Sequence, residues 1–231
     1  MSVAENLAII EERIHKVCAV SGRKRDEITL MGVSKLQPLE AVEQAWEAGL
    51  RCFGESRVQE ATTKLAGLRE SHSGAELHLI GSLQRNKAKA AAAFFDCIQS
   101  VDREALIREL AQCAAARETP LSLLLELHTA EDSKSGFASL DEVYRAVELA
   151  LACPFLRIRG LMTIAPNTRD EGPVRASFRQ LAKAQKELNQ RFALSAGGSC
   201  LSMGMSGDLE IAVEEGSTLL RIGTAIFGER K

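Results

Sequence analysis

Lys35 is the side chain in this sequence best placed to act as a nucleophile. It directly follows the apolar run L-M-G-V-S at 30–34, and Pro38 begins a helical pattern three residues later. An amine fixed at the end of a buried strand, in surroundings of low polarity, loses its proton more readily and becomes reactive toward aldehydes. The same position also fits a solvated lysine that caps a strand end.

A second segment, Arg221–Gly228 (R-I-G-T-A-I-F-G), has the composition of a phosphate-binding turn. Gly223 and Thr224 fall where the last apolar run turns into a helical segment, so exposed N–H groups and a hydroxyl could surround a phosphate there. Ser202, at the end of the preceding apolar run, and Ser206 could add hydroxyls. Without a ligand, the segment is equally consistent with a glycine-rich barrel closure.

The elements that must position these residues alternate regularly along the chain. The predicted strands are Thr29–Ser34, Arg51–Gly54, Leu77–Gly81, Cys97–Val101, Leu121–Leu127, Ile158–Ile164, Cys200–Met203 and Leu219–Ile222. Amphipathic segments separate the strands, and the fifth strand is almost wholly apolar, as expected for a strand covered on both faces. The count of eight favours a (β/α)8 TIM barrel over an open doubly wound sheet, which alternation alone would also allow.

Residue patterns also predict where several of the helices begin. Residues 1–20 have apolar side chains at helical spacing and predict an amphipathic helix packed on the barrel. Capping boxes are expected at Ser56–Gln59 and Ser139–Glu142, and Asp102 is expected to cap the helix after the fourth strand. No linker or shift in composition divides the chain, so we expect residues 1–231 to form one domain.

Barrel closure would bring the two candidate segments together. The first and eighth strands of a closed barrel are neighbours about 4.8 Å apart, so Lys35 and Gly223 would be adjacent although they are far apart in sequence. A small phosphorylated aldehyde could place its carbonyl on the amine and its phosphate on the turn, with Arg221 between them. A lysine, a phosphate-binding turn and an intervening arginine are the parts of a pyridoxal phosphate (PLP) site.

The composition argues against several other classes of function. The net charge of -2 gives no broad attraction for nucleic acid or an anionic membrane, and 4% aromatic residues argue against base stacking. No apolar stretch reaches the ~20 residues of a membrane helix. The six cysteines form no C-x-x-C pair and share no ligand-like spacing with histidine, so we expect reduced thiols, a cytoplasmic location and no metal site.

Other polar residues are weaker candidates. His78 on the third strand and His128 after the fifth are each consistent with a structural role. Lys134, in the polar loop after the fifth strand, is expected to be a solvated loop lysine. Arg85, Lys87 and Lys89 are expected to lie on a solvated helix face.

Several short motifs follow one another along nearly the whole chain. They are G-V-S-K at 32–35, F-G-E at 53–55, V-Q-E at 58–60, H-L-I-G-S-L-Q-R-N-K at 78–87, S-V-D at 100–102, S-K-S-G at 133–136, G-L-M-T-I at 160–164, L-S-M-G-M-S at 201–206 and R-I-G-T-A-I-F-G at 221–228. In the residues and the order of these motifs, the sequence resembles the YggS/PROSC family of pyridoxal phosphate homeostasis proteins. That family looks like the isolated barrel domain of alanine racemase.

The resemblance implies a fold type III PLP-binding barrel and assigns residues to the cofactor. The cofactor-binding residues it implies are Lys35, Ser202, Met203, Ser206, Arg221, Gly223 and Thr224. Lys35 would carry PLP as an internal aldimine, and Ser202, Gly223 and Thr224 would hold the phosphate. Arg221 would face the pyridine nitrogen and keep it unprotonated, which weakens the ring as an electron sink.

Three segments depart from the family pattern. The family usually reads F-G-E-N-Y around the second strand, whereas this chain has Ser56 and Arg57 after F-G-E. The family asparagine at the end of the fifth strand is His128 here, and the family W-H of the third strand is Leu77-His78. None of these departures touches the lysine or the expected phosphate-binding turn, so binding is expected to be retained.

The function that the resemblance implies is a monomeric carrier and regulator of free PLP without robust turnover or assigned catalytic residues, and with PLP-dependent apo-enzymes as candidate recipients. A slow PLP-dependent amino-acid racemase is the alternative. A racemase needs two bases on opposite faces of its substrate, and Lys35 supplies one. A Schiff-base aldolase acting on a phosphorylated sugar is a third reading.

Overall fold

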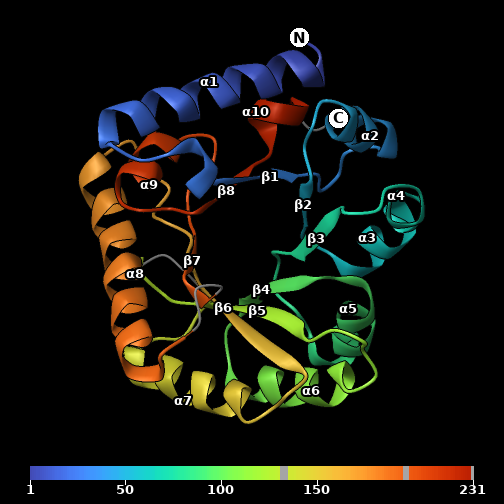
Figure 1. The fold of residues 1–231 in the computed structure, drawn as a ribbon, viewed down its shortest axis with the longest axis vertical. Helices are drawn as coiled ribbons and strands as arrows, with labels where there is room; N and C mark the ends of the chain where they lie inside the picture. Colours follow the sequence, from blue (N-terminus) through green and yellow to red (C-terminus); the bar gives the residue numbers. More distant parts are fainter. Residues whose placement is uncertain (131–134, 195–197, 230–231) are drawn as a thin grey trace.

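Eight parallel strands form a closed barrel in the order β1 to β8. The computed structural model describes residues 1–130, 135–194 and 198–229 of the 231-residue chain, so Lys134 lies outside the described residues. Strand β1 is hydrogen-bonded to both β2 and β8, which closes the ring. Figure 1 shows the helices around the outside of the strands. The predicted (β/α)8 barrel is confirmed.

The strand positions agree with the sequence predictions to within a few residues. The strands are β1 (Thr29–Val33), β2 (Cys52–Glu55), β3 (Glu76–Leu79), β4 (Cys97–Val101), β5 (Leu121–Glu126), β6 (Leu156–Met162), β7 (Cys200–Ser202) and β8 (Leu219–Ile222). The α-helices are α1 (Val3–Ser21), α2 (Leu39–Glu47), α3 (Val58–Lys64), α4 (Ala66–Ser71), α5 (Ala88–Phe94), α6 (Glu104–Ala114), α7 (Leu140–Leu151), α8 (Glu171–Phe192), α9 (Leu209–Glu214) and α10 (Thr224–Phe227), with 3-10 turns η1 (Arg25–Glu27) and η2 (Arg85–Lys87). No helix in the described part of the chain is both long and apolar enough to cross a membrane.

The main apolar core lies between the strands and the surrounding helices. Alternate strand residues such as Phe53, Leu77 and Leu123 are buried in this layer. Because successive side chains of a strand point to opposite faces, the residues between them line the barrel interior. That interior contains small apolar clusters around Met31 and Leu124 together with a set of buried polar side chains. The polar interior is the part of the fold that bears on function.

Helix α1 ties the N-terminal residues to the end of the chain. It begins with a capping box, in which the Glu5 N–H donates to Ser2 Oγ and the Ser2 N–H donates to the Glu5 carboxylate. The Asn6 side chain donates to the carbonyl of Ile226 in α10 over 2.9 Å, and Arg13 pairs with Glu210 of α9 over 2.7 Å. The expected N-terminal helix is confirmed, and it packs against α10, the segment that carries the predicted phosphate-binding turn (Figure 1).

Two of the predicted helix caps are wrong. Helix α3 begins after Arg57, which forms no side-chain cap, and Ser56 contributes to a cavity wall instead. Helix α6 begins after Arg103, and Asp102 accepts from the Arg103 guanidinium instead of capping. Arg103 also donates to the carbonyl of Leu83 over 2.8 Å, which draws this pair toward the neighbouring loop.

The capping box expected at Ser139–Glu142 forms in one direction only. Ser139 Oγ accepts the N–H of Glu142 over 3.3 Å, as predicted. The Glu142 carboxylate accepts the N–H of Ala138 over 2.9 Å, one residue earlier than the box requires. Helix α7 therefore begins where the sequence indicates.

Candidate functional site

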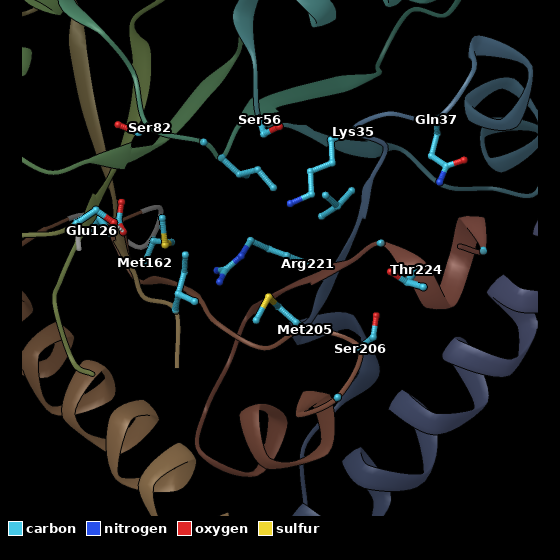
Figure 2. A pocket seen from close by; sticks show the side chains of 18 residues that line it. Lys35, Gln37, Ser56, Ser82, Glu126, Met162, Met205, Ser206, Arg221 and Thr224 are labelled. Atoms are coloured by element: carbon cyan, nitrogen blue, oxygen red, sulfur yellow. Dashed lines mark hydrogen bonds between the residues drawn. The ribbon is translucent and has the colours of Figure 1, made fainter. Parts of the chain in front are cut away.

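A cavity of about 480 Å³ opens at the end of the barrel where the carboxyl ends of the strands meet. Lys35 enters it after β1, Ser56 after β2, Glu126 from the end of β5 and Arg221 from β8. Figure 2 shows the Lys35 and Arg221 side chains extending toward the same space. The volume lies within the range of ~300–1,000 Å³ typical of small-molecule sites. This is the end of a (β/α)8 barrel at which active sites are found.

The turn that carries Lys35 is fixed from both sides by α3. Leu36 adopts φ of 62°, and its N–H donates to Glu60 Oε1 over 2.7 Å. Lys64 Nζ donates to the carbonyl of Ser34 over 2.7 Å and to that of Gln37 over 3.1 Å. The backbone before and after Lys35 is therefore anchored, which fixes the direction in which its side chain leaves the turn.

A buried carboxylate lies directly beneath this turn. Glu55 is fully buried at the end of β2, and its Oε1 lies 2.6 Å from Lys64 Nζ and accepts the Ser34 hydroxyl over 2.7 Å. Lys64 thus neutralises Glu55 while it holds the Lys35 turn. The sequence analysis missed this pair, although Glu55 belongs to the F-G-E motif.

The predicted phosphate-binding turn is assembled at one side of the cavity. Ser206, Gly207, Gly223 and Thr224 all line it, and Figure 2 shows Ser206 and Thr224 at the opposite side of the view from Glu126. Gly223 precedes α10 and Thr224 begins it; the first N–H groups of a helix have no acceptor within that helix. A Cβ at Gly223 would lie 3.3 Å from the Val33 carbonyl oxygen, so the close approach of the turn to β1 favours glycine there.

Arg221 is a buried cavity residue that connects β8 to β7 and to the residue that follows β6. It is 5% exposed; its Nη1 donates to the Ser202 carbonyl and hydroxyl over 2.6 and 2.7 Å, and its Nη2 donates to the Thr163 carbonyl over 2.7 Å. Burial lowers the pKa of the guanidinium to about 10, with the charges of Asp208 and Glu126 acting in the opposite direction. Arg221 is therefore a fixed cation at neutral pH.

Ser202 and Met203 do not line the cavity. Ser202 is fully buried beneath Arg221, and Met203 is fully buried in the main core. The chain then turns at Gly204, where φ is 98° and a Cβ would lie 2.5 Å from the Cβ of Ala212. This turn carries Ser206 back to the cavity. Of the seven residues predicted to contact a cofactor, the structure brings Lys35, Ser206, Arg221, Gly223 and Thr224 together around one space.

Glu126 is a cavity residue that the sequence analysis missed. It is 4% exposed, lines the cavity and accepts the Ser135 hydroxyl over 2.5 Å. Burial raises the pKa of Glu126, against the hydrogen bond from Ser135. The available signal was its position as the one charged residue in the apolar run Leu121–Leu127. The cavity therefore contains a carboxyl group, that of Glu126, as well as the Lys35 amine.

Comparisons with known proteins agree with this geometry. The profile of a family described as the N-terminal domain of alanine racemase matches residues 5–231. The chain is 40% identical over 232 residues to the pyridoxal phosphate homeostasis protein of Vibrio cholerae, covering 99% of this chain and 97% of that protein. It is 36% identical over 231 residues to the protein of the same name from Aquifex aeolicus, covering 100% of both.

Solved structures extend the comparison to three dimensions. PipY of Synechococcus elongatus with PLP bound has a TM-score of 0.84 and 34% identity, covering 98% of this chain and 100% of that one. Alanine racemase of E. faecalis has a TM-score of 0.74 at 16% identity, covering 99% of this chain and 59% of that one, a similarity of fold alone.

Proposed function

The chain belongs to the pyridoxal phosphate homeostasis proteins, within the wider family of alanine racemase N-terminal domains, and from that membership and the cavity we propose that it binds PLP. The observation that carries the proposal is the shared cavity, in which the Lys35 amine, the turn at Gly223 and Thr224, and the buried Arg221 meet. The PLP-bound structure of PipY supports the proposal at 34% identity over nearly the whole chain.

We propose that Lys35 holds PLP covalently. Its Nζ adds to the aldehyde carbon, one water leaves, and a carbon–nitrogen double bond, the Schiff base, remains. Hydrolysis reverses the step, so the aldehyde can be released unchanged. The anchored backbone on both sides of Lys35 supports this role, because it limits the directions in which the amine can approach a ligand.

The other cavity residues fit the rest of the cofactor. Ser206, Gly223 and Thr224 would bind the phosphate through hydroxyl and N–H groups. Arg221 would donate to the pyridine nitrogen, and a guanidinium, which has donors only, favours the unprotonated ring. Ser202 remains a predicted cofactor-site residue in this proposal, acting through Arg221.

We further propose that the protein stores and releases PLP in the cytoplasm as a monomer, with PLP-dependent apo-enzymes as recipients. Ile164 and Met205 line the cavity and are themselves exposed to solvent, which supports an open rim for entry and exit of a small molecule. All six cysteines are free thiols, which supports a reducing compartment.

Replacing Thr224 with valine should weaken PLP binding by about ten- to a hundredfold and leave the fold intact. The substitution removes one hydroxyl from an exposed position of the phosphate-binding turn. A hydrogen bond to a charged group contributes about 1.5–3 kcal/mol. A titration of cofactor-free protein, followed by PLP absorbance, measures the change. Thr218→Val is the control, since Thr218 Oγ1 accepts from Leu201 N–H away from the cavity. Equal affinity of wild type and Thr224→Val would exclude Thr224 from the site.

A slow amino-acid racemase is the second candidate, and Glu126 is the observation that favours it. With Lys35, this buried carboxyl gives the cavity two groups able to exchange protons. Incubation of the loaded protein with L-alanine, and assay of D-alanine, separates the candidates. A carrier should form no D-alanine beyond the amount of protein present. Sustained formation that Glu126→Gln abolishes would establish the racemase instead.

A further inference from the structure

A line of polar side chains, buried except for the half-buried Glu76, runs through the barrel interior from the inner end of the cavity toward the opposite end of the barrel. Arg221 Nη1 lies 2.7 Å from Ser202 Oγ, Ser202 Oγ 2.6 Å from Gln99 Oε1, Gln99 Nε2 2.6 Å from His78 Nδ1, and His78 Nε2 2.9 Å from Glu76 Oε1. We call these five residues the interior chain. They come from β8, β7, β4 and β3, so the chain crosses the barrel.

The donor and acceptor groups of these residues fix the direction in which hydrogen bonds are donated along the interior chain. Arg221 has only donors, so Ser202 Oγ must accept from it and give its own proton to an acceptor, Gln99 Oε1. The Gln99 amide then presents Nε2 to His78, whose Nδ1 must accept. The remaining imidazole proton is therefore on Nε2, which faces the carboxylate of Glu76. From Arg221 through Ser202 and Gln99 to His78, each member donates to the next, and His78 then turns its Nε2 toward Glu76.

The two ends of the interior chain carry opposite charges that match this direction. Arg221 is the cation at the cavity end. At the other end, burial alone would raise the pKa of Glu76, but the contacts with His78 and Arg159 outweigh it and lower the pKa to about 2. Glu76 is thus a carboxylate at neutral pH. The three hydrogen bonds from Arg221 to His78 are all donated in one direction, so they polarise one another in the same sense.

We propose that Gln99 and His78 are positioning residues for Arg221. Gln99 fixes the rotation of the Ser202 hydroxyl, and His78 fixes which way the Gln99 amide faces. Together they hold the guanidinium in a single orientation beneath the cavity. The consequence for PLP rests on the proposed function, because Arg221 can orient the pyridine ring only if the ring is there. The direction of hydrogen-bond donation along the interior chain does not depend on the proposed function.

The same end of the barrel contains a group that resembles a metal site. Ligand atoms of Cys52, Glu76 and His78 all lie within 4.8 Å of one another. The interior chain argues against a metal, because it places a proton on His78 Nε2, the atom that would have to bind one. Glu76 is also paired with Arg159, and burial raises the pKa of the Cys52 thiol well above its ordinary value.

The direction of hydrogen-bond donation along the interior chain can be tested on cofactor-free protein by ¹⁵N NMR of the histidine side chains. The sequence has four histidines, and His78→Gln identifies the signals of residue 78 by their loss. We expect Nδ1 of His78 to be unprotonated and Nε2 to carry the proton. The opposite tautomer, a doubly protonated ring, or a shift of these signals on addition of Zn²⁺ would overturn the proposed chain.

Interrupting the interior chain should change the tautomer of His78. Gln99→Leu, and the smaller change Ser202→Ala, should give a mixture of His78 tautomers. Gln185→Leu is the matched control, because Gln185 is a buried glutamine of α8 whose side chain donates to Asn189 and Gly198 outside the chain. Its His78 signals should match wild type. Wild-type tautomers in both Gln99→Leu and Ser202→Ala would contradict the positioning role.

The effect on the cofactor is measured separately. In PLP-loaded protein, Gln99→Leu should change the absorption spectrum of the bound cofactor and weaken binding by up to about tenfold, the effect of losing one neutral hydrogen bond. Gln185→Leu should change neither. An unchanged spectrum in Gln99→Leu would overturn the role toward PLP. Failure of wild type to bind PLP would instead refute the proposed function and leave the NMR result standing.

Discussion

Replacing Lys35 with alanine should abolish covalent attachment of PLP and weaken its binding by at least about a hundredfold, or about 2.8 kcal/mol. Among the described residues that line the cavity, Lys35 supplies the one amine. Contacts of the phosphate and ring would remain, so the residual binding should be non-covalent. The absorption band of the Schiff base should be missing when the variant is titrated with PLP.

Lys89→Ala is the control for this prediction. Lys89 is an exposed lysine of α5, outside the cavity lining, and its removal should leave affinity and spectrum unchanged. If Lys35→Ala kept the Schiff-base band, another amine would be the point of attachment. If it bound PLP as tightly as wild type, covalent bonding would not contribute to retention.

Replacing Lys64 with methionine should lower the free energy of unfolding by about 3–5 kcal/mol, the cost of leaving a buried charge without its partner. Glu55 is fully buried, and the Lys64 side chain is 11% exposed. The substitution also removes the donor to the carbonyls of Ser34 and Gln37, so the Lys35 turn should loosen and PLP binding should weaken. Urea denaturation of the cofactor-free protein measures the stability change.

Two further variants isolate the cause. Lys64→Met combined with Glu55→Gln should recover part of the stability, because the uncompensated charge is gone. Lys183→Met serves as the control: Lys183 is an exposed partner of Glu187 at 4.0 Å, and exposed pairs of this kind contribute less than about 1 kcal/mol. Equal stabilities of Lys64→Met and Lys183→Met would show that the Glu55–Lys64 pair is not what stabilises the turn.

The fold and the centre of the site could be predicted because they follow from local patterns. Eight apolar runs separated by amphipathic segments specify the strand–helix order, and barrel closure then brings Lys35 beside Gly223. The same reasoning identified Thr224 and Arg221, since both come at the end of β8. No knowledge of side-chain pairing was needed for these residues.

The remaining features depend on which side chains meet across the barrel. Spacing along the chain does not reveal that Lys64 would reach Glu55, or that Gln99 would connect His78 to Ser202. The chain makes a left-handed turn at Gly204, which separates the buried Ser202 from Ser206 in the cavity wall. Strand β7 has three residues, and so short a pattern does not show which way its side chains face.

Borohydride reduction of PLP-loaded wild-type protein, followed by peptide mapping, tests the central proposal most directly. Reduction converts a Schiff base into a stable amine, so the cofactor stays on the lysine that held it. We predict one label per chain, on Lys35. An unlabelled protein, or a label carried by another lysine such as Lys134 with Lys35 unmodified, would contradict the account.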